Sequence, residues 1–255
     1  MNSTNFVRRL SSVWGHSSPV ASLKIVALVL VAASAALWQR SAHSDERPVN
    51  IPAPTQDEHA AAGVHTETAV LAGGCFWGVQ GVYEHVRGVI QVASGYSGGA
   101  AQTAQYERVG EGDTGHAESV QITYDPSQIS YGRILQIFFS VAHNPTELNF
   151  QGPDQGTQYR SAIFAANDQQ RDIAQAYIAQ LQHAHVFPGP IVTHVEAFKG
   201  FYPAEHYHQN FLALHPDYPY IAVNDMPKVQ ALKTLFPNTY RDDPVLYTAS
   251  ASTKG

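Results

Sequence analysis

The sequence of 255 residues is poor in sulfur and in charge. It contains a single cysteine, Cys75, and two methionines, and 14% of its residues are charged, with a formal net charge of -6. One cysteine excludes a disulfide within the chain and any zinc site that needs several cysteines. The lysines and arginines form no cluster, which argues against nucleic-acid binding. The 13 histidines lack the HxxxH spacing of a metal-binding helix, so we predict no metal site.

The first 44 residues have the pattern of an export signal or a short membrane anchor. Arg8, Arg9 and Lys24 precede an uncharged, largely apolar run at 25–39, and no acid occurs before Asp45. As a helix, this run would span about 22 Å, which is short for a bilayer core of about 30 Å. We expect export to the bacterial periplasm, or a tether to the inner membrane facing the periplasm. A transit peptide to an organelle is the alternative.

The rest of the chain divides into a linker and one domain. Residues 45–63 contain several prolines and a run of alanines, which predicts a flexible linker. Residues 64–255 form the predicted domain, and we expect its tail after Pro216 to be irregular. Strand and helix patterns alternate in this domain, which predicts a mixed α/β layer fold. The predicted strands are 68–71, 89–94, 116–124, 159–165 and 191–198, and the predicted helices are 76–86, 130–142, 168–184 and 203–214.

Cys75 lies between the first predicted strand and the first predicted helix, in the stretch LAGGCFWG at 71–78. A thiol at the first turn of a helix faces unpaired backbone N–H groups and the positive end of the helix dipole. Both favour the thiolate, which is the reactive form. A free cysteine is also a common small core residue. Position alone therefore leaves a nucleophile and a buried filler as alternatives.

The position of Glu118 favours the interpretation of Cys75 as a nucleophile. In the alternating strand 116–124, it shares a face with Val120, Ile122 and Tyr124 and is the only charged residue there. A carboxylate on an apolar face is costly, and burial would raise its pKa and keep it protonated, ready to act as an acid. The alternative is an ion pair, for instance with Arg160.

Four aromatic residues add to this pair. Tyr106 and Tyr159 lie at a loop or strand edge, where a phenol can donate a hydrogen bond. Phe76 and Trp77 can line an apolar pocket beside the sulfur, or can simply be core residues. A soft nucleophile, a neutral acid and hydroxyl donors suit an electrophile whose oxygen is protonated as it leaves, such as a sulfoxide or a peroxide. No His–Asn pair supports a papain-like protease.

Five motifs in order carry a resemblance to a known family: GCFW at 74–77, GYSGG at 95–99, GHAE at 115–118, QGTQYRS at 155–161 and YHQ at 207–209. Over residues 66–214, the chain resembles the A-type peptide methionine sulfoxide reductases. The resemblance implies an α+β fold, a two-layer α/β sandwich with a ferredoxin-like βαβ core. It also implies reduction of the S epimer of methionine sulfoxide, free and in proteins, without a cofactor. Such an enzyme would repair oxidised methionines.

The resemblance assigns a role to each candidate residue. It makes Cys75 the nucleophile and Glu118 the acid, and Cys75 would be left as a sulfenic acid. The remaining residues would surround the substrate: Tyr106 and Tyr159 as hydrogen-bond donors to the sulfoxide oxygen, Asp154 as a further acid near the substrate or a bound water, and Phe76 and Trp77 as the wall that binds the methyl group.

The sequence departs from many relatives in its tail. They carry resolving cysteines there, whereas residues 216–255 contain none. An external thiol must therefore reduce the sulfenic acid, and a thioredoxin-like protein, glutaredoxin and glutathione are the candidates. We expect a monomer. The alternative functions are a one-cysteine thiol peroxidase, with Arg160 polarising the peroxide, and a tethered module that binds methionine without turnover.

Overall fold

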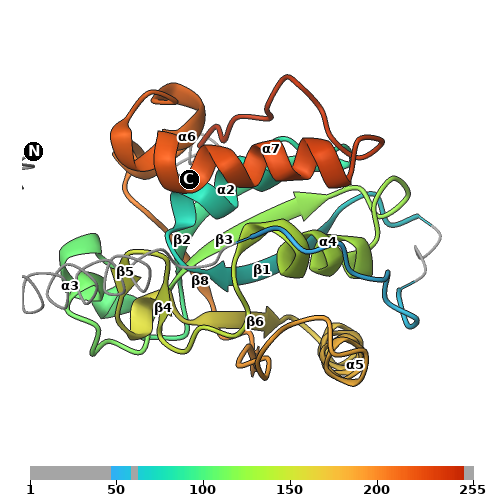
Figure 1. The fold of residues 1–255 in the computed structure, drawn as a ribbon. Coiled ribbons are helices and arrows are strands. Elements are labelled where there is room, and N and C mark those ends of the chain that lie inside the picture. The colour runs from blue at the N-terminus through green and yellow to red at the C-terminus, as the bar shows by residue number, and fades with distance from the viewer. Residues whose placement is uncertain (1–46, 59–62, 250–255) are drawn as a thin grey trace, which may run out of the picture. The chain divides into compact units, whose positions relative to one another are not determined.

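The computed structural model describes residues 47–58 and 63–249, which belong to one compact unit spanning 44–255. In the described residues, six strands form a mixed sheet in the order β7-β6-β1-β3-β2-β8 (Figure 1). Together with the helices packed on this sheet, they confirm the predicted α+β class. The strands of the sheet are β1 (Glu67–Gly73), β2 (Val89–Ser97), β3 (Ala117–Tyr124), β6 (Ser161–Ala165), β7 (His194–Ala197) and β8 (Phe201–Pro203).

The centre of the sheet is a split βαβ unit. β1 and β2 both pair with β3 in the antiparallel sense, so they run parallel to each other on either side of it. Helix α2 (Phe76–Glu84) connects them. On the other side of β1, the strands β6 and β7 pair in parallel and are connected by α5 (Asp168–His183). The strand order β6-β1-β3-β2 is that of the ferredoxin-like core that the resemblance implies, and β7 and α5 extend this core.

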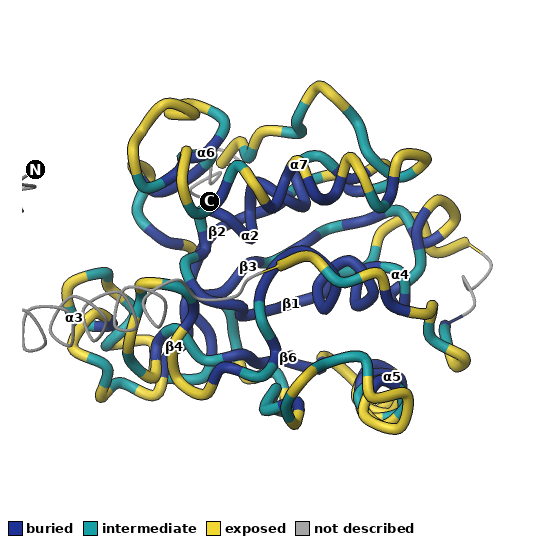
Figure 2. The backbone as a smooth tube through the Cα atoms, viewed as in Figure 1, coloured by how far each residue is buried: buried dark blue, intermediate teal, exposed yellow. Residues whose placement is uncertain are grey.

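The main core lies between one face of the sheet and the helices. Val120, Ile122 and Tyr124 of β3 are fully buried and pack with apolar residues of α2, α4 (Tyr131–Ile137), α5 and α7 (Met226–Leu235). Figure 2 shows the central strands and α2 as the most buried part of the backbone, whereas α5 has an exposed outer side. The alternation of residue types in β3 therefore predicted its buried face correctly.

The predicted flexible linker is wrong over residues 47–58, because this segment packs along α4 and α5. Tyr177 of α5 donates a hydrogen bond of 2.7 Å to the carbonyl of Pro52. Asp57 accepts a bond of 2.7 Å from the N–H of Gly132 at the start of α4. Glu58 is buried and accepts bonds from the Tyr124 hydroxyl at 2.6 Å and the Tyr131 N–H at 2.9 Å. Proline fixes an extended backbone whether or not the segment is packed, so composition alone was misleading here.

Two predictions for the C-terminal part are also wrong. The predicted helix 203–214 is a short 3-10 turn at His206–His208 followed by α6 (Phe211–Leu214). The tail contains a π-helical turn at Ile221–Asp225 that continues into α7, so it is not irregular throughout. Pro227 lies in the first turn of α7, where proline is tolerated.

The predicted export signal at 1–44 lies outside the described residues. In the ranges 47–58 and 63–249, no helix has the length and the apolar character that crossing a membrane requires.

Glu84, the last residue of α2, gives a prediction for stability. Its side chain is fully buried, and its carboxylate oxygens have no hydrogen-bond partner among the described residues. Burial raises its pKa to about 8. The unfolded chain ionises near the usual pKa of about 4.3, so stability is lost as the pH rises from there towards 8, by about 1.4 kcal/mol per pH unit.

We therefore expect Glu84→Gln to raise the free energy of unfolding much more at pH 8 than at pH 5. Urea unfolding at both pH values measures this difference. Glu111→Gln is the matched control, because the Glu111 side chain is 63% exposed. An equal effect of Glu84→Gln at both pH values would contradict the assignment.

Candidate active site

Two glycines place Cys75 at the junction of β1 and α2. Gly74 has a φ of 90°, a conformation that favours glycine, and a Cβ there would lie 2.6 Å from the Gln151 side chain. A Cβ on Gly73 would lie 2.8 Å from the Phe138 ring. The chain therefore turns tightly against its neighbours, and Cys75 becomes the N-cap residue of α2 with its side chain half-buried.

The Cys75 thiol is protonated at rest. Burial raises its pKa well above the usual value, and the carboxylates of Glu118, Asp225 and Asp154 raise it further. The backbone N–H of Trp77 acts in the opposite direction by hydrogen bonding to the sulfur. The helix end thus favours the thiolate, as the sequence suggested, but burial and three acidic neighbours outweigh it. A thiolate must form when the substrate binds.

Glu118 is held beside this thiol as a neutral acid. It lies near the start of β3 with 4% of its surface exposed, and it accepts a hydrogen bond of 3.0 Å from the N–H of Phe76. Burial raises the Glu118 pKa to about 8, Asp154 and Asp225 raise it as well, and the Phe76 N–H lowers it. At neutral pH the carboxyl group therefore carries a proton that it can donate.

Arg160 does not neutralise Glu118. It forms an ion pair of 3.3 Å with Glu196. Its guanidinium also donates to the carbonyls of His116 at 3.1 Å and Gly115 at 3.0 Å. The guanidinium therefore holds the loop before β3, and the geometry does not support the peroxidase alternative, which needs this group at the peroxide.

The three remaining polar candidates lie on separate short elements around the thiol. Tyr106 begins α3 (Tyr106–Gly110), Asp154 begins β5 (Asp154–Gln155), and Tyr159 ends the 3-10 turn Thr157–Tyr159. Burial raises the pKa of Tyr106 to about 12, and Glu118 and Cys75 add to this rise. Burial also raises the pKa of Tyr159, with contributions from Glu118, Asp154 and Cys75. Both phenols keep their protons and can act as hydrogen-bond donors.

Phe76 and Trp77 occupy different positions. Phe76 is fully buried, with its ring centroid 5.1 Å from that of His208. Trp77 is half-buried and stacks on Phe211 at 4.0 Å. Trp77 also donates an indole hydrogen bond of 3.2 Å to Nδ1 of His208. Trp77 is therefore the better placed of the two to contact a ligand, and Phe76 belongs to the buried core on which Trp77 packs.

Sequence reasoning missed several residues that complete the site. His208 lies within the YHQ motif and contacts the rings of Phe76, Trp77 and Tyr106. The Glu205 carboxylate accepts a bond of 3.0 Å from the N–H of Tyr106, which fixes the start of α3. The motif that contains His208 was a signal for it, whereas no local pattern marked Glu205.

The C-terminal tail also reaches the site. The Tyr220 hydroxyl donates a hydrogen bond to Asp154, and the Tyr220 ring lies edge-on to Trp77 with the centroids 5.9 Å apart. Asp225 acts electrostatically on both Cys75 and Glu118. The tail therefore supplies residues to the site although it contains no cysteine.

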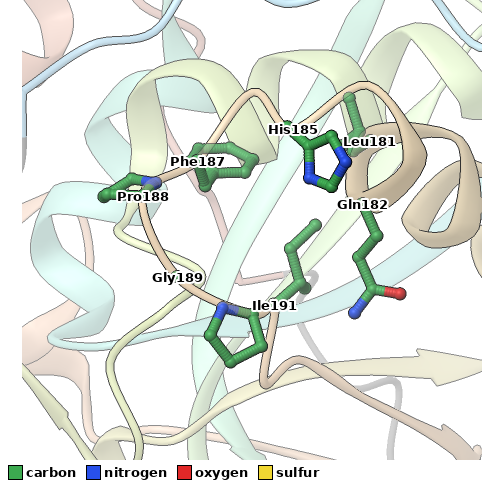
Figure 3. Close-up of a pocket in the computed structure, with 8 residues that line it drawn as sticks. Leu181, Gln182, His185, Phe187, Pro188, Gly189 and Ile191 are labelled. Atoms are coloured by element: carbon green, nitrogen blue, oxygen red, sulfur yellow. The ribbon is translucent and has the colours of Figure 1, made fainter.

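A cavity elsewhere on the domain is not part of this site. It has a volume of about 340 Å³ and lies in the loop between α5 and β7 (Figure 3). Apolar residues such as Leu181, Phe187 and Ile191 line it together with the polar side chains of Gln182 and His185. Its lining includes no nucleophile and none of the candidate residues.

A half-buried thiol at a helix start, a protonated carboxyl beside it and two phenols define a thiol-dependent oxidoreductase on a ferredoxin-like α+β scaffold. Residues 67–239 match the family model of peptide methionine sulfoxide reductases. The chain belongs to this family, and its relatives identify it as an A-type enzyme that reduces methionine sulfoxide.

Relatives and solved structures agree with this assignment. The chain is 63% identical over 196 residues to peptide methionine sulfoxide reductase MsrA 2 of Mesorhizobium japonicum, covering 77% of this chain and all of that one. It is 55% identical over 168 residues to MsrA 2 of Synechocystis, covering 66% and 78% of the two chains. Reduced Mxr1 from Saccharomyces cerevisiae has a TM-score of 0.54 and 33% identity, covering 64% of this chain and 92% of that one. Methionine sulfoxide reductase A of Corynebacterium diphtheriae has a TM-score of 0.52 and 30% identity, covering 68% and 89%.

Proposed function

We propose that Cys75 and Glu118 reduce the S epimer of methionine sulfoxide as a nucleophile and acid pair, on free methionine and in proteins. The observation that carries this proposal is the bond of 3.0 Å between Glu118 and the N–H of Phe76, the residue next to Cys75. It fixes a protonated carboxyl group to the same helix turn that carries the thiol. Protonation of the oxygen requires such an acid beside the sulfur.

The reaction transfers one oxygen atom. The Cys75 sulfur attacks the sulfoxide sulfur while Glu118 gives its proton to the oxygen, and Tyr106 and Tyr159 stabilise that oxygen by hydrogen bonds. The S–O bond of the substrate breaks and the oxygen leaves as water. This water then attacks the Cys75 sulfur and breaks the new bond between the two sulfurs, which releases methionine and leaves Cys75 as a sulfenic acid. The thiol proton replaces the proton that Glu118 donated. Cys75 is oxidised by one electron pair, and the methionine sulfur is reduced by the same pair.

Asp154 and the aromatic residues position the substrate in this proposal. The Asp154 carboxylate is held by Tyr220 and faces the thiol, where it can bind the substrate or a water. Trp77 offers an apolar surface to the methyl group, with Phe76 behind it.

Recycling needs a reductant from outside the chain, because Cys75 is the only cysteine of the sequence. A first external thiol displaces water from the sulfenic acid and forms a mixed disulfide. A second thiol releases Cys75 by thiol–disulfide exchange. A thioredoxin-like protein or glutaredoxin can supply both thiols, and two glutathione molecules can do the same. No prosthetic group takes part in these steps.

Separated epimers test this proposal. We expect one equivalent of the S epimer to yield one equivalent of methionine without added reductant. We also expect a dimedone adduct on Cys75 by mass spectrometry. The R epimer is the matched control and should yield neither product. Equal reduction of both epimers, or methionine formed without an adduct at Cys75, would contradict the mechanism.

We also propose that the apolar run at 25–39 directs the domain to the periplasm, either as a cleaved signal or as an anchor facing that compartment. The basic residues before the run and the absence of acids before Asp45 support this proposal. Cell fractionation followed by N-terminal sequencing tests it, and recovery of the uncleaved chain from the cytoplasm would contradict it.

A further inference from the structure

A buried ion pair from the tail lies against the first turn of α2. Asp225 ends the π-helical turn Ile221–Asp225 and is 0% exposed, and Lys228 in α7 is 6% exposed. The Lys228 Nζ atom lies 3.6 Å from Oδ1 of Asp225. Figure 1 shows α7 running along α2, and the π-helical turn leads directly into α7. Both charges are therefore buried on the side of α2 that faces the tail.

The Asp225 carboxylate touches the backbone of the helix that carries the thiol. A Cβ on Gly78 would lie only 2.2 Å from Asp225 Oδ1 and 2.7 Å from its carboxyl carbon. Only a glycine leaves room for a carboxylate in this place. Gly78 is the third residue of α2, so the negative charge lies within one turn of Cys75.

The Asp225 carboxylate and a Cys75 thiolate would therefore both lie at the N-terminal end of α2. The first N–H groups of a helix have no partner within it and attract negative charge. In α2, the Phe76 N–H binds Glu118 and the Trp77 N–H binds the Cys75 sulfur. A second fixed negative charge at this end opposes ionisation of the thiol, because like charges close together raise each other's energy.

Among the ionisable groups around Cys75, Asp225 makes its own contribution to the negative charge near the thiol. The thiol is faced by Glu118 of β3, Asp154 of β5, Tyr106 of α3, Tyr159 of the 3-10 turn, and Tyr220 and Asp225 of the tail. Glu118 is neutral below a pH of about 8, and the phenols keep their protons. The two aspartates remain, and Asp154 is held by Tyr220 in the proposed substrate site.

We infer that Asp225, held by Lys228, is a positioning residue that keeps the resting Cys75 in the thiol form until a sulfoxide binds. This inference rests on the proposed role of Cys75 as the nucleophile. Lys228 offsets the free-energy cost of burying the Asp225 carboxylate, since a buried charge without a partner destabilises the fold. The benefit is selectivity, because peroxide oxidises the thiolate and not the thiol. This protection matters in a sequence whose single cysteine cannot form an internal disulfide with a second one.

The pH dependence of Cys75 alkylation by iodoacetamide tests this inference on the full chain. We expect Asp225→Asn to move the alkylation midpoint down by at least about one pH unit. That shift means about tenfold faster alkylation at pH 7, since each pH unit is a factor of ten in the thiolate population. Inactivation by hydrogen peroxide should accelerate by the same factor. Asp225→Ser removes the same charge and gives a second measurement if the asparagine variant does not fold.

Glu84→Gln is the matched control, because Glu84 is also a fully buried acid of this region but lies at the far end of α2. Its alkylation midpoint should equal that of the unaltered protein. The inference is overturned if neither Asp225 variant shifts the midpoint, or if Glu84→Gln shifts it equally. Alkylation needs no sulfoxide, so a shifted midpoint in a protein that cannot reduce sulfoxide would contradict the proposed function and not this inference.

Discussion

Replacing Cys75 by serine is expected to reduce the turnover of methionine sulfoxide by about 10⁴-fold or more, the loss typical of removing a covalent nucleophile. A serine hydroxyl needs a neighbouring base to become a nucleophile. The neighbouring carboxyl group of Glu118 is protonated at neutral pH because burial raises its pKa to about 8. Glu118 therefore acts as an acid at neutral pH and cannot take the proton of a serine hydroxyl. Methionine release with a thiol reductant measures the loss.

Substrate binding provides the control for this variant. The apolar wall at Trp77 is unchanged in Cys75→Ser, so the sulfoxide should still change the tryptophan fluorescence with an affinity within a few-fold of the unaltered protein. Turnover retained in the serine variant would rule out Cys75 as the nucleophile. Loss of both binding and turnover, together with an altered circular dichroism spectrum, would mean that the substitution disturbs the fold.

Replacing Glu118 by glutamine is expected to slow the first turnover by about 10²–10⁴-fold, the usual contribution of a general acid. Substrate affinity should change little, because glutamine keeps the shape and can still accept the hydrogen bond from Phe76. The unaltered protein should also lose activity as the pH rises through about 8, where Glu118 gives up its proton. This falling limb should be absent in Glu118→Gln, which has no proton to lose.

Rapid quenching of a single turnover between pH 6 and 9.5 separates these effects, with pH values chosen on either side of the Glu118 pKa of about 8. Glu84→Gln again provides a matched control, since burial raises the pKa of Glu84 to about 8 as well, but this residue lies at the other end of α2. That variant should keep both the rate and the falling limb. An unchanged first turnover in Glu118→Gln would remove this residue from the role of acid.

The sequence predicted the elements whose signals are local. The alternation in β3 identified the buried face of Val120, Ile122 and Tyr124 because a strand places every second side chain on one side. The pair of glycines before Cys75 likewise marked a tight turn between a strand and a helix. Segments that are ordered by distant partners escaped prediction. Residues 47–58 depend on bonds to α4 and α5 far along the chain, such as that between Pro52 and Tyr177.

The same distinction applies to the site. Cys75 and Glu118 could be proposed because an unusual residue type coincided with a regular local pattern. Glu205 binds the N–H of Tyr106 across 99 residues, and no pattern near either residue indicates this contact. No local pattern indicates the role of Asp225 either, since only the fold brings it to Gly78. The rise in the pKa of Cys75 could not be predicted for a related reason, because the burial and the acidic neighbours that cause it arise from tertiary packing.

The packing of residues 47–58 limits where the proposed export signal could be cleaved without loss of contacts in the domain. A peptidase that cut after Glu58 would remove Asp57 from the start of α4, Glu58 from Tyr124 and Pro52 from Tyr177. If the proposed signal is cleaved, the cut must therefore lie before Pro52 for the domain to keep these contacts. A processing site closer to β1 would give a chain that retains the catalytic residues but has lost the segment that covers two of its helices.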